Sequence, residues 1–319
     1  MTISSKSYPQ MRKEFFEKYI NIIVPLVQKQ EKIRKTKLIA AIVLSILSLI
    51  LGIFILYTTF ALHEELHMSS RECGKSLEVG LTFLILPTFI YEMIKKNFEN
   101  SIKKRIMPSV CNCFGDLKWT QGIYKESSIF SDSQIFCSVP ITSKIYDDIF
   151  KGRYKGVNID IVESNFSIGN GKNKSTIFNG VIIKLSMNKP FNCHTLIKPN
   201  SLMHTPPSYK LKYTELEDPE FNKIFDVYTN DEITARYLIT PSFMQRLKNM
   251  EVAFKADNTS CAFYENYLII ALSTKKDLFS LCSLIKPLKE TQQYFQMYEE
   301  IVSILKLIDH FKLDQKIGL

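Results

Sequence analysis

The stretch LIAAIVLSILSLILGIFILYTTFAL, residues 38–62, decides the fold of this 319-residue chain. It contains no charged side chain and exceeds the roughly 20 residues that an α-helix needs to cross the hydrocarbon core of a bilayer. Its apolar side chains would occupy every face of a helix, whereas a helix on a soluble core has one apolar face. It also begins too far from the N-terminus and runs too long for a cleavable signal peptide. The stretch therefore predicts a transmembrane helix.

A second apolar run lies shortly after the first, over residues 76–93. Glu78 stands near one end of this run, Glu92 near the other, and Pro87 inside it. A transmembrane helix tolerates such a proline where neighbouring groups satisfy the freed carbonyl. A buried or interfacial helix is the alternative interpretation. We predict a second transmembrane helix over residues 76–93 and a short outer loop over residues 63–75.

Basic residues gather at the two flanks of this hairpin. The chain has a net charge of +9, and residues 1–37 hold nine Lys and Arg against three Glu. Residues 92–105 hold five against two, whereas residues 63–78 hold two against four. The positive-inside rule therefore places both termini in the cytoplasm. The remaining residues, 106–319, are close to neutral, which argues against a nucleic-acid partner.

Amphipathic helices are predicted on both flanks. Apolar residues recur there at helical spacing, at Phe15, Phe16, Tyr19, Ile20, Ile23 and Val27 and again at Ile94, Phe98, Ile102 and Ile106. We predict a basic amphipathic cytoplasmic helix over residues 1–37 and a juxtamembrane stalk helix over residues 94–110. Pro25 is expected to bend the first helix, and Pro108 to end the second.

Residues 111–319 have the pattern of a soluble α+β domain. Residues 157–162 alternate as a strand does, and a polar loop leads from there to a return strand at 177–185. Residues 263–271 predict a second hairpin, with a helix over 240–250 and a closing amphipathic helix over 289–311. The predicted fold class is α+β, with a transmembrane hairpin, a helical stalk and a mostly antiparallel sheet on which helices pack.

The motif with the sharpest chemistry is H-E-x-x-H at His63-Glu64-Glu65-Leu66-His67. On a helix, the two imidazoles share one face and can bind zinc, while Glu64 acts as general base on the metal-bound water. Glu65, however, puts a charge where metalloprotease helices carry uncharged residues, and the short loop offers no substrate cleft. A membrane zinc metalloprotease with His63 and His67 as metal ligands and Glu64 as catalytic residue is therefore the alternative function. Apart from that zinc, no cofactor is expected.

A charged segment in the second half offers a candidate contact for a ligand or partner. Asp231, Glu232 and Arg236 are close enough in sequence to form a local charge network. The simpler interpretation of this network is structural. The alternative is that Arg236, together with Asp231, contacts a partner or ligand.

Several segments resemble an uncharacterised bacterial family of membrane-anchored proteins, known only as a domain of unknown function. They are DDIFKG (147–152), FNG (178–180), EDPEFNKIFDVY (217–228), DEITARYLITP (231–241), YLIIAL (267–272), KDLF (276–279) and LIDHFKLD (307–314). The resemblance covers residues 98–319, and the two N-terminal spans also fit the layout of that family. It implies no activity and no catalytic residue. The H-E-x-x-H motif lies outside the resembling region.

The sequence therefore predicts a bacterial inner-membrane protein with two spans and both termini in the cytoplasm. Its biochemical activity is unknown, and binding is favoured over catalysis. We expect the α+β domain to bind a protein or lipid partner, and the basic flanks to contact the lipid bilayer. A homo-oligomer is compatible with the sequence.

Overall fold

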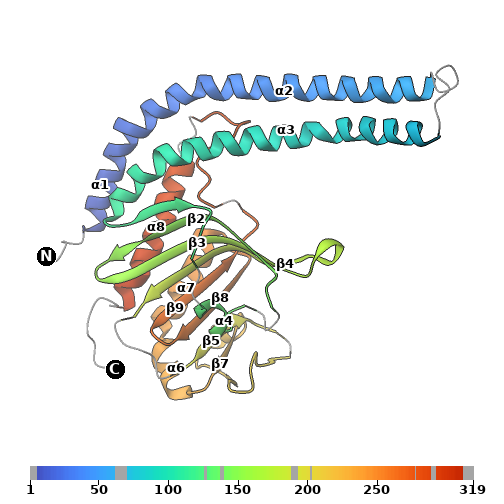
Figure 1. Ribbon diagram of the computed structural model, residues 1–319. Helices are drawn as coiled ribbons and strands as arrows, with labels where there is room; N and C mark the ends of the chain where they lie inside the picture. The colour runs from blue at the N-terminus through green and yellow to red at the C-terminus, as the bar shows by residue number, and fades with distance from the viewer. Residues whose placement is uncertain are drawn as a thin grey trace. The chain divides into compact units, whose positions relative to one another are not determined.

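The two apolar stretches form two long helices (Figure 1). The first begins as α1, Tyr8–Lys18, and continues through a π-helical turn, Tyr19–Ile23, into α2, Val24–Ala61. The second is α3, Ser70–Cys111. Both helices are long and apolar enough to cross a membrane, as the sequence predicts.

Large apolar side chains on these helices point outward. Phe54 and Phe60 of α2 are 59% and 74% exposed, and Ile85 and Phe89 of α3 are 68% and 71% exposed. Apolar area on this scale is unfavourable in water. Such a surface is typical of a segment whose surroundings are lipid or another protein.

The computed structural model describes residues 6–61, 70–125, 128–136, 140–187, 193–201, 203–276, 278–288 and 292–311. They fall into two compact units. The helical unit contains Glu17–Met107 and Ser280–Gln293. The sheet unit contains the N-terminal residues up to Phe16, then Pro108–Phe279, and the C-terminal residues from Tyr294.

Small residues and hydroxyl groups hold α2 against α3 inside the helical unit. A Cβ added to Gly52 would lie 3.1 Å from the carbonyl oxygen of Gly80, so the two backbones approach closely there. Ser48 Oγ donates to the Phe83 carbonyl at 2.8 Å. Close packing of small residues and hydrogen bonds between helices are the main sources of helix association in lipid. The two helices therefore form an antiparallel hairpin.

The two prolines at the flanks behave differently from one another. The π-helical turn ends at Ile23, two residues before Pro25. The proline ring has no N–H to donate and crowds the carbonyl group four residues earlier. A wider, π-helical turn accommodates both effects. The prediction that Pro108 ends α3 is wrong, because the helix continues to Cys111. Pro108 removes one hydrogen bond in the last turn, and the packing of the buried Val110 and Cys111 outweighs that loss.

A segment of the helical unit that is neither helix nor strand, residues 280–288, is here named the strap. Arg34 of α2 is 5% exposed, and its Nη1 donates to the strap carbonyls of Leu284, at 2.7 Å, and Ile285, at 3.0 Å. Its Nε and Nη2 donate to the two carboxylate oxygens of Glu31 at 2.9 and 2.7 Å. Glu31 in turn accepts from the backbone N–H of Leu288 at 3.1 Å. One charged pair thus fixes the strap to α2.

The described part of the sheet unit contains one antiparallel sheet of nine strands. Their order is β1-β2-β3-β4-β9-β8-β5-β7-β6. The strands are β1 Lys118–Gln121, β2 Ser143–Tyr154, β3 Val157–Ile168, β4 Ser175–Ser186, β5 Thr195–Pro199, β6 Lys212–Thr214, β7 Phe225–Thr229, β8 Asn258–Tyr264 and β9 Tyr267–Ser273. The β3–β4 and β8–β9 hairpins are those that the sequence predicts. The predicted α+β class is confirmed.

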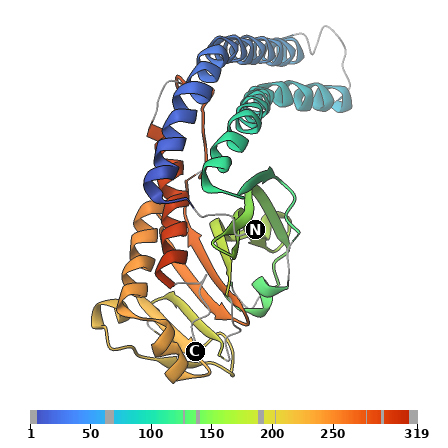
Figure 2. The ribbon, with the colours of Figure 1, turned by 90° about the vertical axis from the view of Figure 1, so that its left-hand side faces the viewer.

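Helices and a long connection cover the two faces of the sheet. The helices are α4 Ile129–Asp132, α5 Pro219–Asn222, α6 Glu232–Leu238, α7 Pro241–Phe254 and α8 Gln292–Phe311. α7 and α8 lie side by side on one face (Figures 1 and 2), and Phe243 of α7 packs on Phe263 of β8 with ring centroids 5.4 Å apart. On the other face, Tyr124, Phe130 and Phe136 join the strand residues in one apolar cluster. The core therefore has two layers, one on each side of the sheet.

A buried carboxyl group lies within α8. Glu300 is 2% exposed, and burial raises its pKa from the usual 4.5 to about 7, while Gln296, Lys255 and Lys276 act in the opposite direction. The folded chain therefore binds a proton that the unfolded chain releases between about pH 4.5 and pH 7. Since the charged form is the costly one, stability falls as the pH rises through this window and is lowest above it.

Glu300→Gln is therefore expected to raise the free energy of unfolding by about 2–3 kcal/mol at pH 8 and to leave it nearly unchanged at pH 4. Urea titrations in detergent micelles at both pH values measure the difference. Glu299→Gln, at the exposed neighbouring position, is the matched control. A variant at position 300 that gains equally at both pH values would refute the assignment.

Candidate functional site

A β-bulge in β2 brings acidic side chains together. Tyr146 pairs with Ser164 and Ile149 pairs with Val162, so Asp147 and Asp148 both lie opposite the single residue Glu163 of β3. Such a bulge bends the strand and redirects its side chains. One carboxylate oxygen from each of the three acidic residues lies within 4.8 Å of the others.

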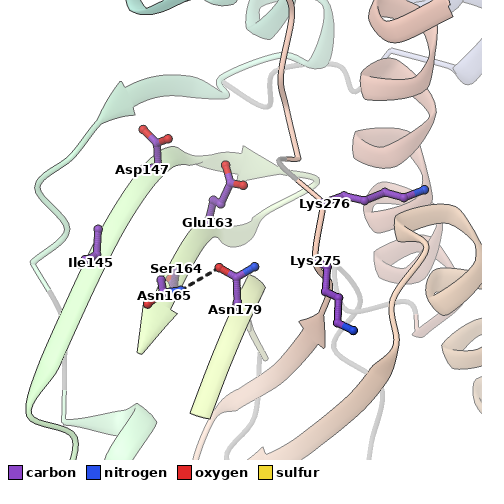
Figure 3. Close-up of a pocket in the computed structure, with 8 residues that line it drawn as sticks. All are labelled: Ile145, Asp147, Glu163, Ser164, Asn165, Asn179, Lys275 and Lys276. Atoms are coloured by element: carbon purple, nitrogen blue, oxygen red, sulfur yellow. Dashed lines mark hydrogen bonds between the residues drawn. The ribbon is translucent and has the colours of Figure 1, made fainter. Parts of the chain in front are cut away.

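The bulge borders a polar pocket of about 320 Å³ (Figure 3). The residues around it come from β2, β3, β4 and the segment after β9, and they are Ile145, Asp147, Glu163, Ser164, Asn165, Asn179, Lys275 and Lys276. Asn165 Nδ2 donates to Asn179 Oδ1 at 2.9 Å, and Asn179 Nδ2 donates to the Thr274 carbonyl at 2.7 Å. In Figure 3, the side chains of both lysines extend away from the two carboxylates. The pocket therefore presents carboxylate and amide groups to solvent.

Each carboxylate at the bulge also has a structural hydrogen bond. Asp147 accepts from Gln121 Nε2 at 2.9 Å, and the fully buried Asp148 accepts from Trp119 Nε1 at 2.7 Å. Glu163 accepts from the backbone N–H of Leu278 at 3.1 Å. Among the described residues, this trio has the donor set that a divalent cation prefers. The hydrogen bonds show that it also joins β1, β2, β3 and the chain after β9.

Three of the segments that carry the family resemblance meet at this pocket. DDIFKG supplies Asp147, FNG supplies Asn179, and KDLF supplies Lys276. No motif in the sequence indicates this pocket, because the pocket depends on a bulge whose register is set by strand pairing. The signal that could have found it is the consecutive acidic pair inside a strand.

A second cavity, of about 450 Å³, lies beside α6 and is here named the Arg236 groove. Its charged lining residues are Glu217, Asp218 and Arg236, and its apolar lining residues are Leu216, Pro219, Ile239, Pro241 and Met244. Arg236 Nη2 donates to the Glu215 carbonyl at 2.8 Å and to Glu232 Oε1 at 2.7 Å. The guanidinium thus links α6 to the chain that precedes α5.

Asp231, the other predicted contact residue, caps the N-terminus of α6. Its carboxylate accepts from the backbone N–H groups of Ile233, at 3.1 Å, and Thr234, at 3.2 Å, and from the Thr234 hydroxyl at 2.6 Å. The Thr234 hydroxyl is the largest of the influences that lower the pKa of Asp231. Asp231 therefore has a clear structural role, as an N-cap residue does. The structure places Arg236, but not Asp231, among the residues that line the groove.

The H-E-x-x-H motif lies outside the described residues. His63, Glu64 and His67 all fall between Ala61 and Ser70, where the described helices α2 and α3 end and begin.

A histidine–aspartate pair that no motif in the sequence indicates lies at β7. His204 Nδ1 lies 2.8 Å from Oδ1 of Asp226, a carboxylate that is 1% exposed and also accepts from Ser201 and Tyr228. Burial is the first cause, and the bond to Asp226 the second, of a Tyr228 pKa raised to about 12. The two partners stand 22 residues apart with no motif between them, so the sequence does not indicate that they pair.

Comparison with known proteins confirms the resemblance over part of the region that carries it. Residues 176–313 match the model of a family described as a protein of unknown function, DUF3137. No curated protein matches the chain. One solved structure is similar, the crystal structure of the mycobacterial trehalose monomycolate transport factor A, TtfA, at 9% sequence identity and a TM-score of 0.34. That match covers 64% of this chain and 91% of the other.

Proposed function

We propose that this chain is an inner-membrane protein with two spans, whose sheet unit lies in the cytoplasm and binds a protein or lipid partner. One observation carries the proposal: α2 and α3 form an antiparallel hairpin whose two basic flanks lie at the same end. Ser48 pairs with Phe83, and Thr59 pairs with Ser76 near the other end. By the positive-inside rule, the end with the basic flanks faces the cytoplasm.

The same basic flanks support contact with anionic lipid. Each Lys or Arg near the surface of an anionic leaflet contributes about 1 kcal/mol of attraction, which falls off within a Debye length. Lys35 and Lys37 on α2 and Lys95 and Lys96 on α3 belong to these flanks. The polar pocket and the Arg236 groove are two concave surfaces in the described part of the sheet unit, and they support binding of a partner.

The proposal predicts a definite topology. Green fluorescent protein fused at either terminus is expected to fluoresce, because it matures in the cytoplasm, and alkaline phosphatase fused at the C-terminus is expected to be inactive. A membrane-impermeant maleimide added to spheroplasts is expected to label Cys73, at the outer end of α3. Cys73→Ser is the control for that labelling. An active C-terminal phosphatase fusion would overturn the proposal.

A further inference from the structure

We propose that the Arg236 groove binds a basic, amphipathic segment of a partner protein, one large apolar side chain of which fills the cavity. This inference rests on the proposed function and specifies the partner. It also commits to protein rather than lipid as the occupant of this surface.

The walls of the groove suit an apolar side chain. Ile239 and Met244 are 2% and 5% exposed, so they form a fixed floor, and Leu216 is 6% exposed beside them. Pro219 and Pro241 stand at the first positions of α5 and α7 and restrict the backbone on two sides. A cavity of about 450 Å³ accommodates a side chain of the size of Leu, Met or Phe together with part of its backbone.

The rim of the groove is acidic, although the chain as a whole is basic. Four acidic residues, Glu215, Glu217, Asp218 and Glu220, occur in six consecutive positions. Lys223 pairs with Glu220 at 2.6 Å, so the excess negative charge comes from the other three, of which Glu217 and Asp218 line the groove. The carboxylate of Glu232, which is 59% exposed, is balanced by Arg236, so this ion pair leaves the excess negative charge of the rim unchanged. Charge complementarity therefore selects a basic segment, and the same rim repels anionic headgroups. This decides between a protein and a lipid occupant.

Two exposed apolar side chains extend the surface beyond the cavity. Ile233 and Tyr237 of α6 are 83% and 57% exposed. They stand four residues apart, so they share a face of the helix, next to the face that carries Glu232 and Arg236. An amphipathic segment that places one side chain in the cavity can cover this pair with the next.

Arg236 acts in this arrangement as a positioning residue. It is 37% exposed, and its bonds to Glu232 and to the Glu215 carbonyl hold the acidic stretch beside α6. The N-cap bonds of Asp218, to the N–H groups of Glu220 at 2.9 Å and Phe221 at 3.1 Å, fix the other side of that stretch. The acidic rim is thus preorganised for its partner, which lowers the entropic cost of binding.

The test uses the full chain in nanodiscs of phosphatidylcholine and three fluorescein-labelled peptides of equal length. The first peptide contains Lys, Arg and Leu, the second has Glu in place of the basic residues, and the third has Ser in place of Leu. Fluorescence anisotropy, corrected with empty nanodiscs, gives each Kd. We expect the first peptide to bind with a Kd about tenfold lower than either of the others.

Glu217→Lys is expected to raise the Kd of the first peptide about fivefold, because it reverses a charge on the lining of the groove. The side chain of Glu217 is exposed, so folding is not at risk. Glu299→Lys, an equal change of charge on the exposed surface of α8, is the matched control and is expected to leave the Kd unchanged. Equal binding of all three peptides, or equal loss in both variants, would overturn the inference.

Light scattering on the same samples tests the remaining occupant. A contrary outcome is that the chain self-associates through its basic residues 1–37 and that Glu217→Lys abolishes that association. The occupant of the groove would then be a second copy of the chain and not a separate partner, which would overturn the inference. The topology experiment is independent of these readouts. If the peptides fail while both terminal fusions fluoresce, the groove is misassigned and the proposed function stands; an active C-terminal phosphatase removes the proposed function whatever the peptides do.

Discussion

Arg34→Ala is expected to lower the free energy of unfolding of the helical unit by about 3–5 kcal/mol. The guanidinium is 5% exposed and donates to two strap carbonyls and to both oxygens of Glu31. Alanine would leave a partly buried carboxylate without its cation and two carbonyls without their donor. Breaking one partner of a buried pair costs more than the pair itself contributes, because the remaining charge stays desolvated.

Thermal unfolding in detergent micelles and limited proteolysis of the strap would measure this loss. Lys35→Ala removes an exposed charge one residue away and is expected to change the stability by less than about 0.5 kcal/mol. The bond to Arg34 is the largest influence on Glu31 and lowers its pKa. This contribution is therefore present above the unfolded-state pKa of Glu31 and is lost as the pH falls through the lower, folded-state value. A strap that stays protected in Arg34→Ala would contradict the assignment.

Gly180→Ala is expected to destabilise the sheet unit by about 4 kcal/mol. Gly180 lies in β4 with φ of +152°, a conformation that residues with a side chain rarely adopt. An added Cβ would also overlap the backbone carbonyl oxygen of Leu272 in β9, which cannot move without breaking the ladder. Two penalties therefore act together, and the neighbouring Asn179 would lose its place at the polar pocket.

Gly171→Ala separates the two penalties. Gly171 has φ of +57°, but nothing lies within 4 Å of an added Cβ there. Only the backbone penalty remains, so we expect a loss of about 1 kcal/mol. Urea titrations of both variants provide the comparison. Equal losses at positions 180 and 171 would show that the close approach of β9 does not matter.

Local periodicity was enough to predict much of this fold. The spans follow from two long apolar runs, of which only the first is free of charged residues, and the hairpins follow from alternation around polar turns. Thr240-Pro241 marks the start of α7, and the Thr240 side chain does accept from the N–H of Phe243. Tyr294, Tyr298 and Ile301, predicted on one stripe of the closing helix, are all buried. Each of these patterns lies in the same short segment of sequence as the helix or strand that it predicts.

Features that depend on distant pairing were not predictable. The sequence around Asp147 and Asp148 indicates a strand at most. Only the pairing of β2 with β3 places both residues opposite Glu163. In the sequence, Arg34 is one of nine basic residues whose charges orient a hairpin. Its guanidinium binds carbonyl groups 250 residues further along the chain. A count of charges gives its sign and not its partner.

Each unit combines segments that are far apart in the sequence, and this restricts when each unit can fold during translation. Phe15 leaves the ribosome early, yet its ring contacts, Phe295 and Tyr298, leave near the end. The strap that Arg34 binds also emerges long after α2 has been made. Neither unit can close until residues beyond position 280 have been synthesised, so neither can finish folding while only its first segments have emerged. Throughout that interval the nascent chain must keep Phe15 and the strap-binding side of α2 from aggregating.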